Sequence, residues 1–306
     1  MKTKKLISTT ILVVILALAV LFIKNNLKDF KQLIITNPIN IIYIIIISLI
    51  VYLVLGVINK ELLKPLNVNI NLKESTLISL VNSFYNLITP FRGGIATRAY
   101  YLKKKYNLQY TKFLGLVATS TLLVILISSI LGIIATIIIY QKENYTNPII
   151  PLIFLATFIL TLSIAIISPT LKETKHSFIN KFIRVINSFS EINKNKSFIS
   201  ATILTLIQIL LSAYSTQLTF GVFGIEIGFI KALFISSIGG ISLAISLTPA
   251  NLGVAEAITV FSAQTIGIGP VESLSAAIIG RLIQFVTLFI LGPLASYKLF
   301  KKNGKI

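Results

Sequence analysis

The dominant pattern along this chain is a series of long apolar runs separated by short polar segments rich in lysine. A membrane-spanning helix needs about 20 apolar residues, because each residue adds about 1.5 Å and the hydrocarbon layer is about 30 Å thick. Runs that approach or exceed this length cover residues 6–23, 32–59, 113–141, 144–171, 197–225 and about 272–297, and they are uncharged apart from Glu272 at the very start of the last run and Arg281 within it. The pattern predicts an all-α polytopic membrane protein with about six spanning helices.

The first apolar run also has features of a secretory signal peptide. Lysines at positions 2, 4 and 5 precede it, and Ala17-Leu18-Ala19 is a possible cleavage pattern. Apolar residues continue beyond that pattern to Ile23. The continuation favours a retained membrane anchor.

Two regions, residues 75–102 and 229–268, are too polar and too interrupted to be ordinary spans. The first contains Thr89-Pro90 and Gly93-Gly94, and the second contains Thr248-Pro249 and Gly253. Proline removes a backbone donor and glycine loosens a helix, so each helix should break there. Because broken helices at membrane depth survive only inside protein or beside a wet cavity, both regions are predicted to be re-entrant helical hairpins.

The two regions resemble each other when the chain is shifted by the distance that separates Thr89 from Thr248. Thr, Pro, Gly and Ala of Thr89–Ala96 recur at the same places in Thr248–Ala255, and the spans near 39–58 and 113–139 match those near 198–217 and 272–298. The agreement predicts an internal repeat of span, broken hairpin and span. We expect one membrane domain, residues 1–306, with repeat 1 at 39–140 and repeat 2 at 198–298.

Composition supports the membrane assignment and excludes several other classes of protein. The chain is 55% apolar and 12% charged, with a mean hydropathy of +0.90, whereas soluble domains are typically about 25% charged. It contains no cysteine, which excludes disulfides, thiolate catalysis and iron–sulfur clusters. The net charge of +19 is spread between apolar runs and forms no basic domain, so we expect anionic lipids, and no nucleic acid, as partners.

Charge also predicts orientation in the cell membrane. With both termini cytoplasmic and each hairpin returning to its starting side, 20 of the 28 Lys and Arg residues lie on the cytoplasmic side, as the positive-inside rule requires. The first repeat then starts outside and the second inside. Such inverted-topology repeats are typical of alternating-access transporters. The predicted cytoplasmic segments are 1–5, 60–74, 103–112, 169–196 and 298–306.

Four charged residues fall within the predicted membrane-embedded segments: Arg92, Arg98, Glu256 and Arg281. A charge at the centre of a spanning helix costs about 2.5–3.5 kcal/mol on insertion scales, so each should have a partner or water. Three arginines and one glutamate leave a surplus of positive charge. Because a guanidinium binds phosphate through two hydrogen bonds, the surplus predicts an anionic substrate group.

The predicted turns add backbone donors to this site. After each Thr-Pro pair a new half-helix begins, and its unpaired N–H groups and positive dipole end favour an anion. Glycine at these positions would let the backbone approach a phosphate closely. The substrate-binding candidates are therefore Arg92, Arg98, Glu256, Arg281, Thr89, Gly93, Gly94, Asn251 and Gly253.

Structural alternatives stay open for several of these residues. Arg98 lies five residues before Lys103 and could extend to the cytoplasmic surface. Arg281 and Glu256 could form an ion pair that locks two helices together. The polar residues Asn82, Asn86, Gln208, Gln217, Asn251 and Gln284 could line a pathway or form hydrogen bonds between helices.

The segment 172–196 is predicted to be a cytoplasmic loop with a possible interfacial helix. Phe178, Phe182, Ile186 and Phe189 recur at helical spacing among several lysines, as expected of a helix lying on an anionic leaflet. A solvated loop is the alternative. The segment does not enter the predicted substrate site.

Catalysis finds little support in the sequence. Asp29 is the only aspartate, the membrane-embedded segments hold one carboxylate, and no nucleophile stands in an arrangement with His176. No phosphate-binding Gly-x-x-x-x-Gly-Lys-Ser/Thr pattern occurs. We therefore expect neither an enzyme nor a site for a metal or cofactor.

Two stretches resemble the signatures of the lysylphosphatidylglycerol synthase transmembrane-region family. The first runs from Asn82 to Gly94 and continues through Arg98 to Lys104, and the second comprises Leu247 to Glu256 together with Arg281. The resemblance covers residues from about 5 to 300. It implies a flippase-like domain that moves lipids between leaflets, with Arg92, Arg98, Glu256 and Arg281 as site candidates.

The sequence departs from this family in two respects. Ala118-Thr119-Ser120-Thr121 stands where members often carry an acidic and a basic residue. The soluble aminoacyl-transferring domain of the full synthases is not expected in these 306 residues, and synthase activity is not expected either.

Three functions follow as hypotheses. The first is a flippase-like transporter of an anionic phospholipid or lipid-linked phosphate. The second is a proton-coupled secondary transporter of a small anion, with Glu256 as the coupling residue. The third is a non-transporting subunit of a lipid-modifying assembly, and a homodimer or a lipid-modifying enzyme is a possible partner.

Overall fold

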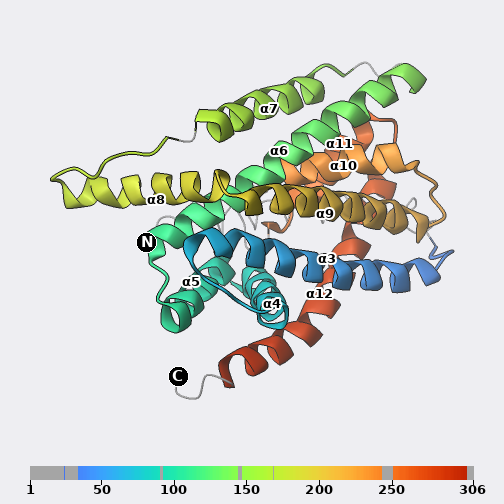
Figure 1. Cartoon of the computed structure of the whole chain (residues 1–306). Coiled ribbons are helices and arrows are strands. Elements are labelled where there is room, and N and C mark those ends of the chain that lie inside the picture. The colour runs from blue at the N-terminus through green and yellow to red at the C-terminus, as the bar shows by residue number, and fades with distance from the viewer. Residues whose placement is uncertain are drawn as a thin grey trace.

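The computed structural model describes residue 24 and residues 34–89, 92–143, 147–167, 169–242 and 251–301. Within these ranges the chain forms α-helices and one short 3-10 helix, and it contains no β-strand (Figure 1). The predicted all-α class is confirmed. The predicted first span, residues 6–23, lies outside the described residues.

Five of the described helices are long and apolar enough to cross a membrane. They coincide with the five other predicted spans, so the chain is a polytopic membrane protein. A short 3-10 turn, Lys64–Leu66, extends the first of them. The five are α3 (Ile39–Leu63), α6 (Tyr110–Glu143), α7 (Ile149–Ile167), α9 (Lys196–Gly221) and α12 (Pro270–Lys301).

Four shorter helices occupy the two regions predicted to be broken hairpins. In the first region α4 (Leu72–Ile88) is followed by α5 (Gly93–Tyr106), and in the second α10 (Phe229–Ser242) is followed by α11 (Val254–Thr265). Helix α4 ends directly before Thr89-Pro90, as expected because proline cannot continue the backbone hydrogen-bond pattern. The Thr248-Pro249 pair lies outside the described residues. Re-entry of these hairpins into a bilayer stays a prediction.

The helices repeat in order and in packing. The starts of α9, α10, α11 and α12 follow those of α3, α4, α5 and α6 at a nearly constant interval along the chain. Helices α3 and α9 pack side by side, α4 packs on α12, and α10 packs on α6 (Figure 1). The two sets are α3–α6 and α9–α12, and the hairpin of each set thus lies against the last helix of the other set. The inverted-topology repeat stays a prediction, which this arrangement supports.

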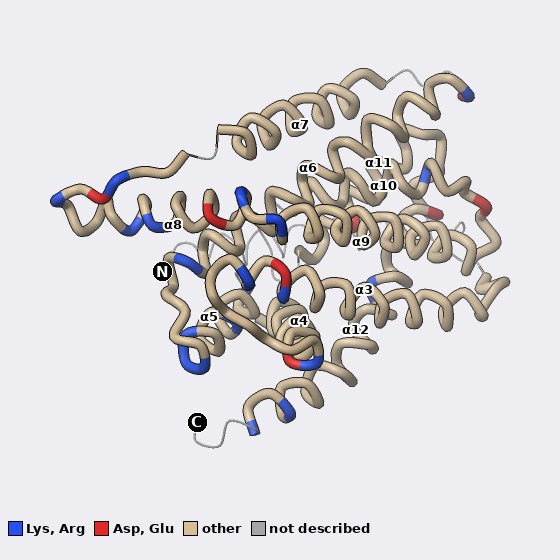
Figure 2. The backbone as a smooth tube through the Cα atoms, viewed as in Figure 1, with Lys and Arg blue, Asp and Glu red and all other residues tan. Residues whose placement is uncertain are grey.

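The two ends of the helical bundle differ in charge. Lysine and arginine residues gather where α5, α8 and the last turns of α12 lie (Figure 2). We call this the basic end. At the opposite end, where α6 ends and α10 begins, Lys142 and Lys231 lie near Glu143 and Glu226. The asymmetry supports the predicted orientation, which itself stays a prediction.

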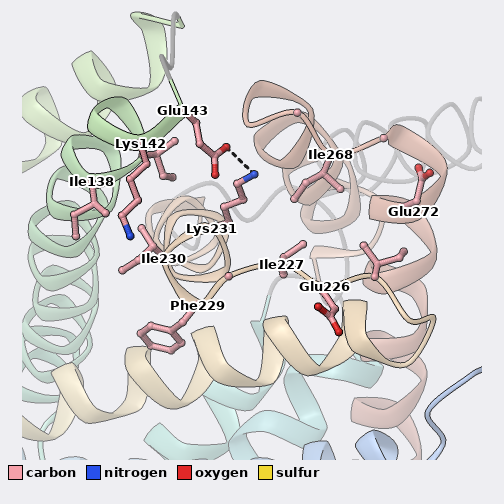
Figure 3. A pocket seen from close by; sticks show the side chains of 15 residues that line it. Ile138, Lys142, Glu143, Glu226, Ile227, Phe229, Ile230, Lys231, Ile268 and Glu272 are labelled. Atoms are coloured by element: carbon pink, nitrogen blue, oxygen red, sulfur yellow. Dashed lines mark ion pairs between the residues drawn. The ribbon is translucent and has the colours of Figure 1, made fainter.

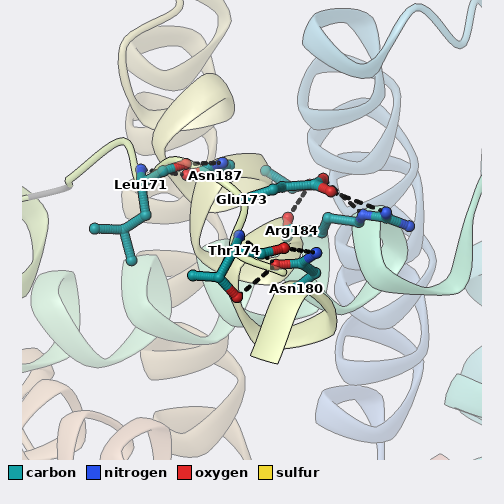
Figure 4. Close-up of polar contacts among 7 residues, drawn as sticks. Leu171, Glu173, Thr174, Asn180, Arg184 and Asn187 are labelled. Carbon is teal, nitrogen blue, oxygen red and sulfur yellow. Dashed lines mark hydrogen bonds and ion pairs between the residues drawn. The ribbon is translucent and has the colours of Figure 1, made fainter. Parts of the chain in front are cut away.

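A helix, α8 (Ser177–Asn193), forms within the predicted cytoplasmic loop. Its Phe189 is buried, whereas Phe178 and Phe182 are exposed, so the predicted apolar stripe divides between the protein core and the surface. Polar contacts hold residues 171–174, which precede the helix, along α8. Among them is the ion pair between Glu173 and Arg184 at 2.8 Å (Figure 4). Contact of α8 with a membrane surface stays a prediction.

Candidate functional site

Glu256 joins the start of α11 to the middle of α12. One carboxylate oxygen, Oε2, accepts a hydrogen bond from the backbone N–H of Gly253 at 2.6 Å, and Oε1 accepts one from Nε of Arg281 at 2.7 Å. Nη1 of Arg281 also donates to Oε1 of Gln284 at 3.3 Å. The sequence left open whether Glu256 and Arg281 form a structural ion pair, and the two residues do form one.

The local sequence explains why this pair forms. Gly253 has a φ of 80°, a value that residues with a side chain rarely adopt, and it occupies the position before α11. Glu256 is three residues further on, which is the spacing at which a glutamate reaches back to the first free N–H of a helix. The carboxylate is therefore positioned by its own helix, and Arg281 neutralises it.

Arg98 lies on α5 in a different environment. Only 7% of the residue is exposed, and its Nε and Nη2 atoms are buried without a hydrogen-bond partner among the described residues. The guanidinium carbon stands 5.5 Å from the centre of the Phe113 ring, a cation–π contact. This burial does not fit the alternative in which Arg98 extends to the aqueous surface. Arg98 is a buried positive charge with no acidic partner in the part of the chain that is described.

Arg92 occupies the turn between α4 and α5. It is half-buried and directly precedes α5, with a left-handed backbone conformation of φ 54° and ψ 53°. Asn251, at the corresponding place in the second hairpin, has a φ of 57°. The side-chain oxygen of Asn251 is buried without a partner among the described residues. Both residues thus lie in the turns where the sequence predicted substrate contacts.

The remaining candidates have contacts within their own hairpins. A Cβ atom on Gly94 would collide with the backbone oxygen of Asn82, so glycine is needed there for the close approach of α5 to α4. A Cβ on Gly93 would meet the side chain of Thr89, whose hydroxyl donates to the carbonyl oxygen of Tyr85. Packing within the hairpin thus accounts for the residue types at Thr89, Gly93 and Gly94. Their predicted contact with a phosphate stays a prediction.

Several buried polar atoms besides those of Arg98, that of Asn251 among them, have no hydrogen-bond partner within the described part of the chain. Buried polar groups in proteins are nearly always paired with protein, water or ligand, so such atoms mark places where polar molecules can bind. The sequence pointed to the asparagines and Gln208 but not to the two serines, because serine in a helix most often bonds to its own backbone. These atoms belong to Asn82, Asn86, Ser128, Gln208, Ser237 and Asn251.

No three histidine, aspartate or glutamate side chains of the described residues are grouped so that they could hold a metal ion. The absence of a metal and of a cofactor stays an expectation. Phe113 was also not among the predicted site residues, because an apolar residue at the start of a span carries no signal of a cation–π contact. The described part of the site thus contains the Glu256–Arg281 ion pair, the buried guanidinium of Arg98 without an acidic partner, and several buried polar atoms without a hydrogen-bond partner.

The fold and these charges define a multi-pass helical membrane protein with two broken hairpins and ionisable residues inside the bundle. The chain matches the family described as "Lysylphosphatidylglycerol synthase TM region" over residues 6–292 and belongs to that family. It is also similar to the UPF0104 membrane protein MJ1595 of Methanocaldococcus jannaschii, with 25% identity over 332 aligned positions that cover 98% of this chain and 99% of the relative. The resemblance seen in the sequence motifs is confirmed.

Proposed function

We propose that this protein is a flippase-like transporter that moves an anionic phospholipid or a lipid-linked phosphate between the leaflets of the cell membrane. Its family and its polytopic helical fold support a role connected with membrane lipids. The observation that carries the anionic substrate is Arg98, a nearly fully buried guanidinium with two nitrogen atoms free to donate among the described residues.

Arg98, which is buried, and Arg281, which is partly buried, differ in what compensates their charge. Arg281 is neutralised by Glu256, so its cost of burial is offset within the protein. Among the described residues, Arg98 contacts the face of Phe113 and has no acidic partner, and a buried charge without a partner is costly. A phosphate would supply the missing negative charge and two acceptor oxygens, which match the fork of a guanidinium. The protein would thereby gain its most favourable contact when an anionic head group is bound.

The arrangement of the hairpins supports transport over simple binding. Each hairpin packs on the last helix of the other set, and the two sets repeat in order. If the sets are inverted relative to each other, rocking one set against the other opens the site to the two sides in turn. The head group would pass along the buried polar atoms while the lipid tails stay in the bilayer. The basic end would then face the cytoplasm.

The contacts of Glu256 argue against proton-coupled transport of a small anion. Both carboxylate oxygens are occupied, one by Arg281 and one by the Gly253 N–H, which is typical of a structural role. We also propose that the protein is not an enzyme, since no described side chain of the site pairs a nucleophile with a base that could activate it. Anionic lipids remain its proposed partners.

A lipid-flipping assay tests the proposal. The protein is reconstituted into vesicles with fluorescent phosphatidylglycerol, and the fraction of label accessible to an external reductant is followed over time. Arg98→Gln should slow flipping about tenfold or more, because a hydrogen-bonded charge is lost. Arg184→Gln, which removes an exposed charge on α8, is the matched control and should flip at the normal rate. Equal rates in protein-free vesicles, or an undiminished Arg98→Gln variant, would overturn the proposal.

A further inference from the structure

The two nitrogen atoms of Arg98 that are buried without a partner among the described residues, Nε and Nη2, form one edge of its guanidinium. The N–H groups on such an edge are nearly parallel and match the spacing of two oxygens of one anion. Among the described residues that are buried, Arg98 is the one that carries a charge. The buried charge therefore has its free donors along a single edge, in the plane of the group.

Arg184 shows how this edge binds an anion in the same protein. Its Nε donates to Oε1 of Glu173 at 2.8 Å, and its Nη2 donates to Oε2 at 3.1 Å (Figure 4). One group with two oxygens thus occupies both donors at once. At Arg98 no acidic residue of the described chain takes this place, so the same edge fits the two oxygens of a ligand.

Phe113 holds the guanidinium of Arg98 without using these donors. The guanidinium carbon lies 5.5 Å from the centre of the Phe113 ring, and the Phe113 side chain is itself buried. A cation–π contact is an attraction to the ring and occupies no conventional acceptor. Arg98 lies on α5 and Phe113 on α6. The contact therefore fixes the guanidinium between two helices while its Nε–Nη2 edge stays available.

Other charged residues of the bundle are better compensated. A cavity of about 670 Å³ at the end opposite the basic end is lined by Glu226 and Glu272 among other residues. There Glu143 pairs with Lys231 at 2.7 Å, and both side chains are partly exposed to solvent (Figure 3). Water and ion pairing thus share the cost of these charges. The Arg98 site differs, because it presents one positive charge in buried surroundings.

We propose that Arg98 and Phe113 form the recognition site for a phosphodiester that carries one negative charge, with Phe113 as a positioning residue. The two non-bridging oxygens bind Nε and Nη2, and the single negative charge neutralises the guanidinium. A phosphomonoester carries more than one negative charge at pH 7, and the excess would be buried at a cost. The inference rests on the proposed function and narrows its substrate to a phospholipid head group in place of a lipid-linked monophosphate.

Binding is measured first, without transport. The chain contains no tryptophan, so Phe113→Trp places a single fluorescent reporter beside Arg98 and keeps an aromatic ring for the cation–π contact. The full chain in non-ionic detergent is titrated with dihexanoylphosphatidylglycerol, which should change the emission and saturate. Dihexanoylphosphatidic acid, a monoester, and inorganic phosphate should bind about tenfold more weakly or not at all. The double variant Phe113→Trp/Arg98→Gln should give no saturable response.

Flipping measured at several mole fractions of labelled phosphatidylglycerol then tests the positioning role. Phe113→Leu should raise the fraction needed for the half-maximal rate about threefold or more and keep the maximal rate within about twofold, because the lost contact orients the binding edge. Phe113→Tyr, which keeps a ring, should restore the normal value. Phe300→Leu is the matched control and should flip normally. It removes a ring that packs on Tyr101 in the same hydrophobic cluster.

Three results would overturn this proposal: equal binding of the phosphatidic acid and phosphatidylglycerol probes, an unresponsive Phe113→Trp chain, or equal effects of Phe113→Leu and Phe300→Leu on flipping. Each of them can occur while Arg98→Gln still slows flipping, and the proposed function would then stand. Normal flipping by Arg98→Gln would instead overturn the proposed function. The two failures are therefore distinguishable.

Discussion

Arg92 and Asn251 adopt the same left-handed backbone conformation, with φ values of 54° and 57°, at equivalent positions of the two hairpins. Each stands in the turn before the second helix of a broken hairpin. The left-handed region costs a residue with a side chain about 1–2 kcal/mol, so its use at both places indicates one turn geometry in the two hairpins. The pair supports the proposed repeat at the level of backbone geometry.

The turn at Asn251 should be sensitive to the shape of its residue. Asn251→Gly should keep the free energy of unfolding within about 0.5 kcal/mol, because glycine adopts a positive φ without cost. Asn251→Val should lower it by about 1–2 kcal/mol, since a β-branched residue is strongly disfavoured there. Thermal unfolding in detergent measures the difference. Equal stability of the two variants would show that the turn does not need this conformation.

The Glu256–Arg281 pair should be coupled in stability. Removing one partner leaves the other partly buried without its opposite charge, so Glu256→Gln and Arg281→Gln should each destabilise the protein by about 2–4 kcal/mol. The double variant should be less destabilised than the two losses added together, by about 1–3 kcal/mol. A double-mutant cycle of unfolding free energies checks this. Additive losses would mean that the 2.7 Å contact contributes nothing.

Arg98 should oppose stability while supporting function. Arg98→Met removes a buried charge that has no acidic partner among the described residues, and methionine fills a similar volume beside Phe113. We expect unchanged or increased stability, by up to about 3 kcal/mol, together with strongly reduced lipid flipping. Unfolding midpoints and flipping rates are measured on the same preparation. A destabilised variant with normal flipping would contradict the assigned role.

Glu74 should make the basic end of the protein sensitive to acid. Burial raises its pKa, but hydrogen bonds from Lys105 at 2.8 Å, Tyr106 at 2.6 Å and Tyr101 at 2.9 Å outweigh burial and hold the pKa below the usual 4.5. Because the folded pKa is the lower one, this stabilisation is present above pH 4.5 and is lost as the pH falls through the folded value.

Glu74→Gln should therefore lower stability by about 1 kcal/mol at pH 7, a modest loss because solvent screens this partly exposed group, and by much less at pH 3. Thermal unfolding of both proteins across this pH range measures the change. Glu173→Gln is a suitable control. Its carboxylate also has a pKa held below the usual value by Arg184, but both groups are fully exposed. A loss that is equal at the two pH values would contradict the role of the Glu74 carboxylate.

The sequence alone determined the class of protein, the five described spans and the first helix break. These follow from local properties: the length of an apolar run decides whether a helix can cross a bilayer, and Thr89-Pro90 ends α4 whatever surrounds it. The family was also evident from residues close together in the chain. Helix lengths and breaks are decided within a few turns of backbone, so they could be predicted.

Only the tertiary structure decided which charges meet. Glu256 and Arg281 are far apart in the sequence and pair because α11 packs on α12, whereas Arg98, equally prominent in the sequence, is left beside Phe113 without an acidic partner in the described chain. The cavity lined by Glu226 and Glu272 likewise arises where three separate helix ends converge. Pairing and enclosed space depend on how distant helices pack against one another, and no pattern along a single segment carries that information.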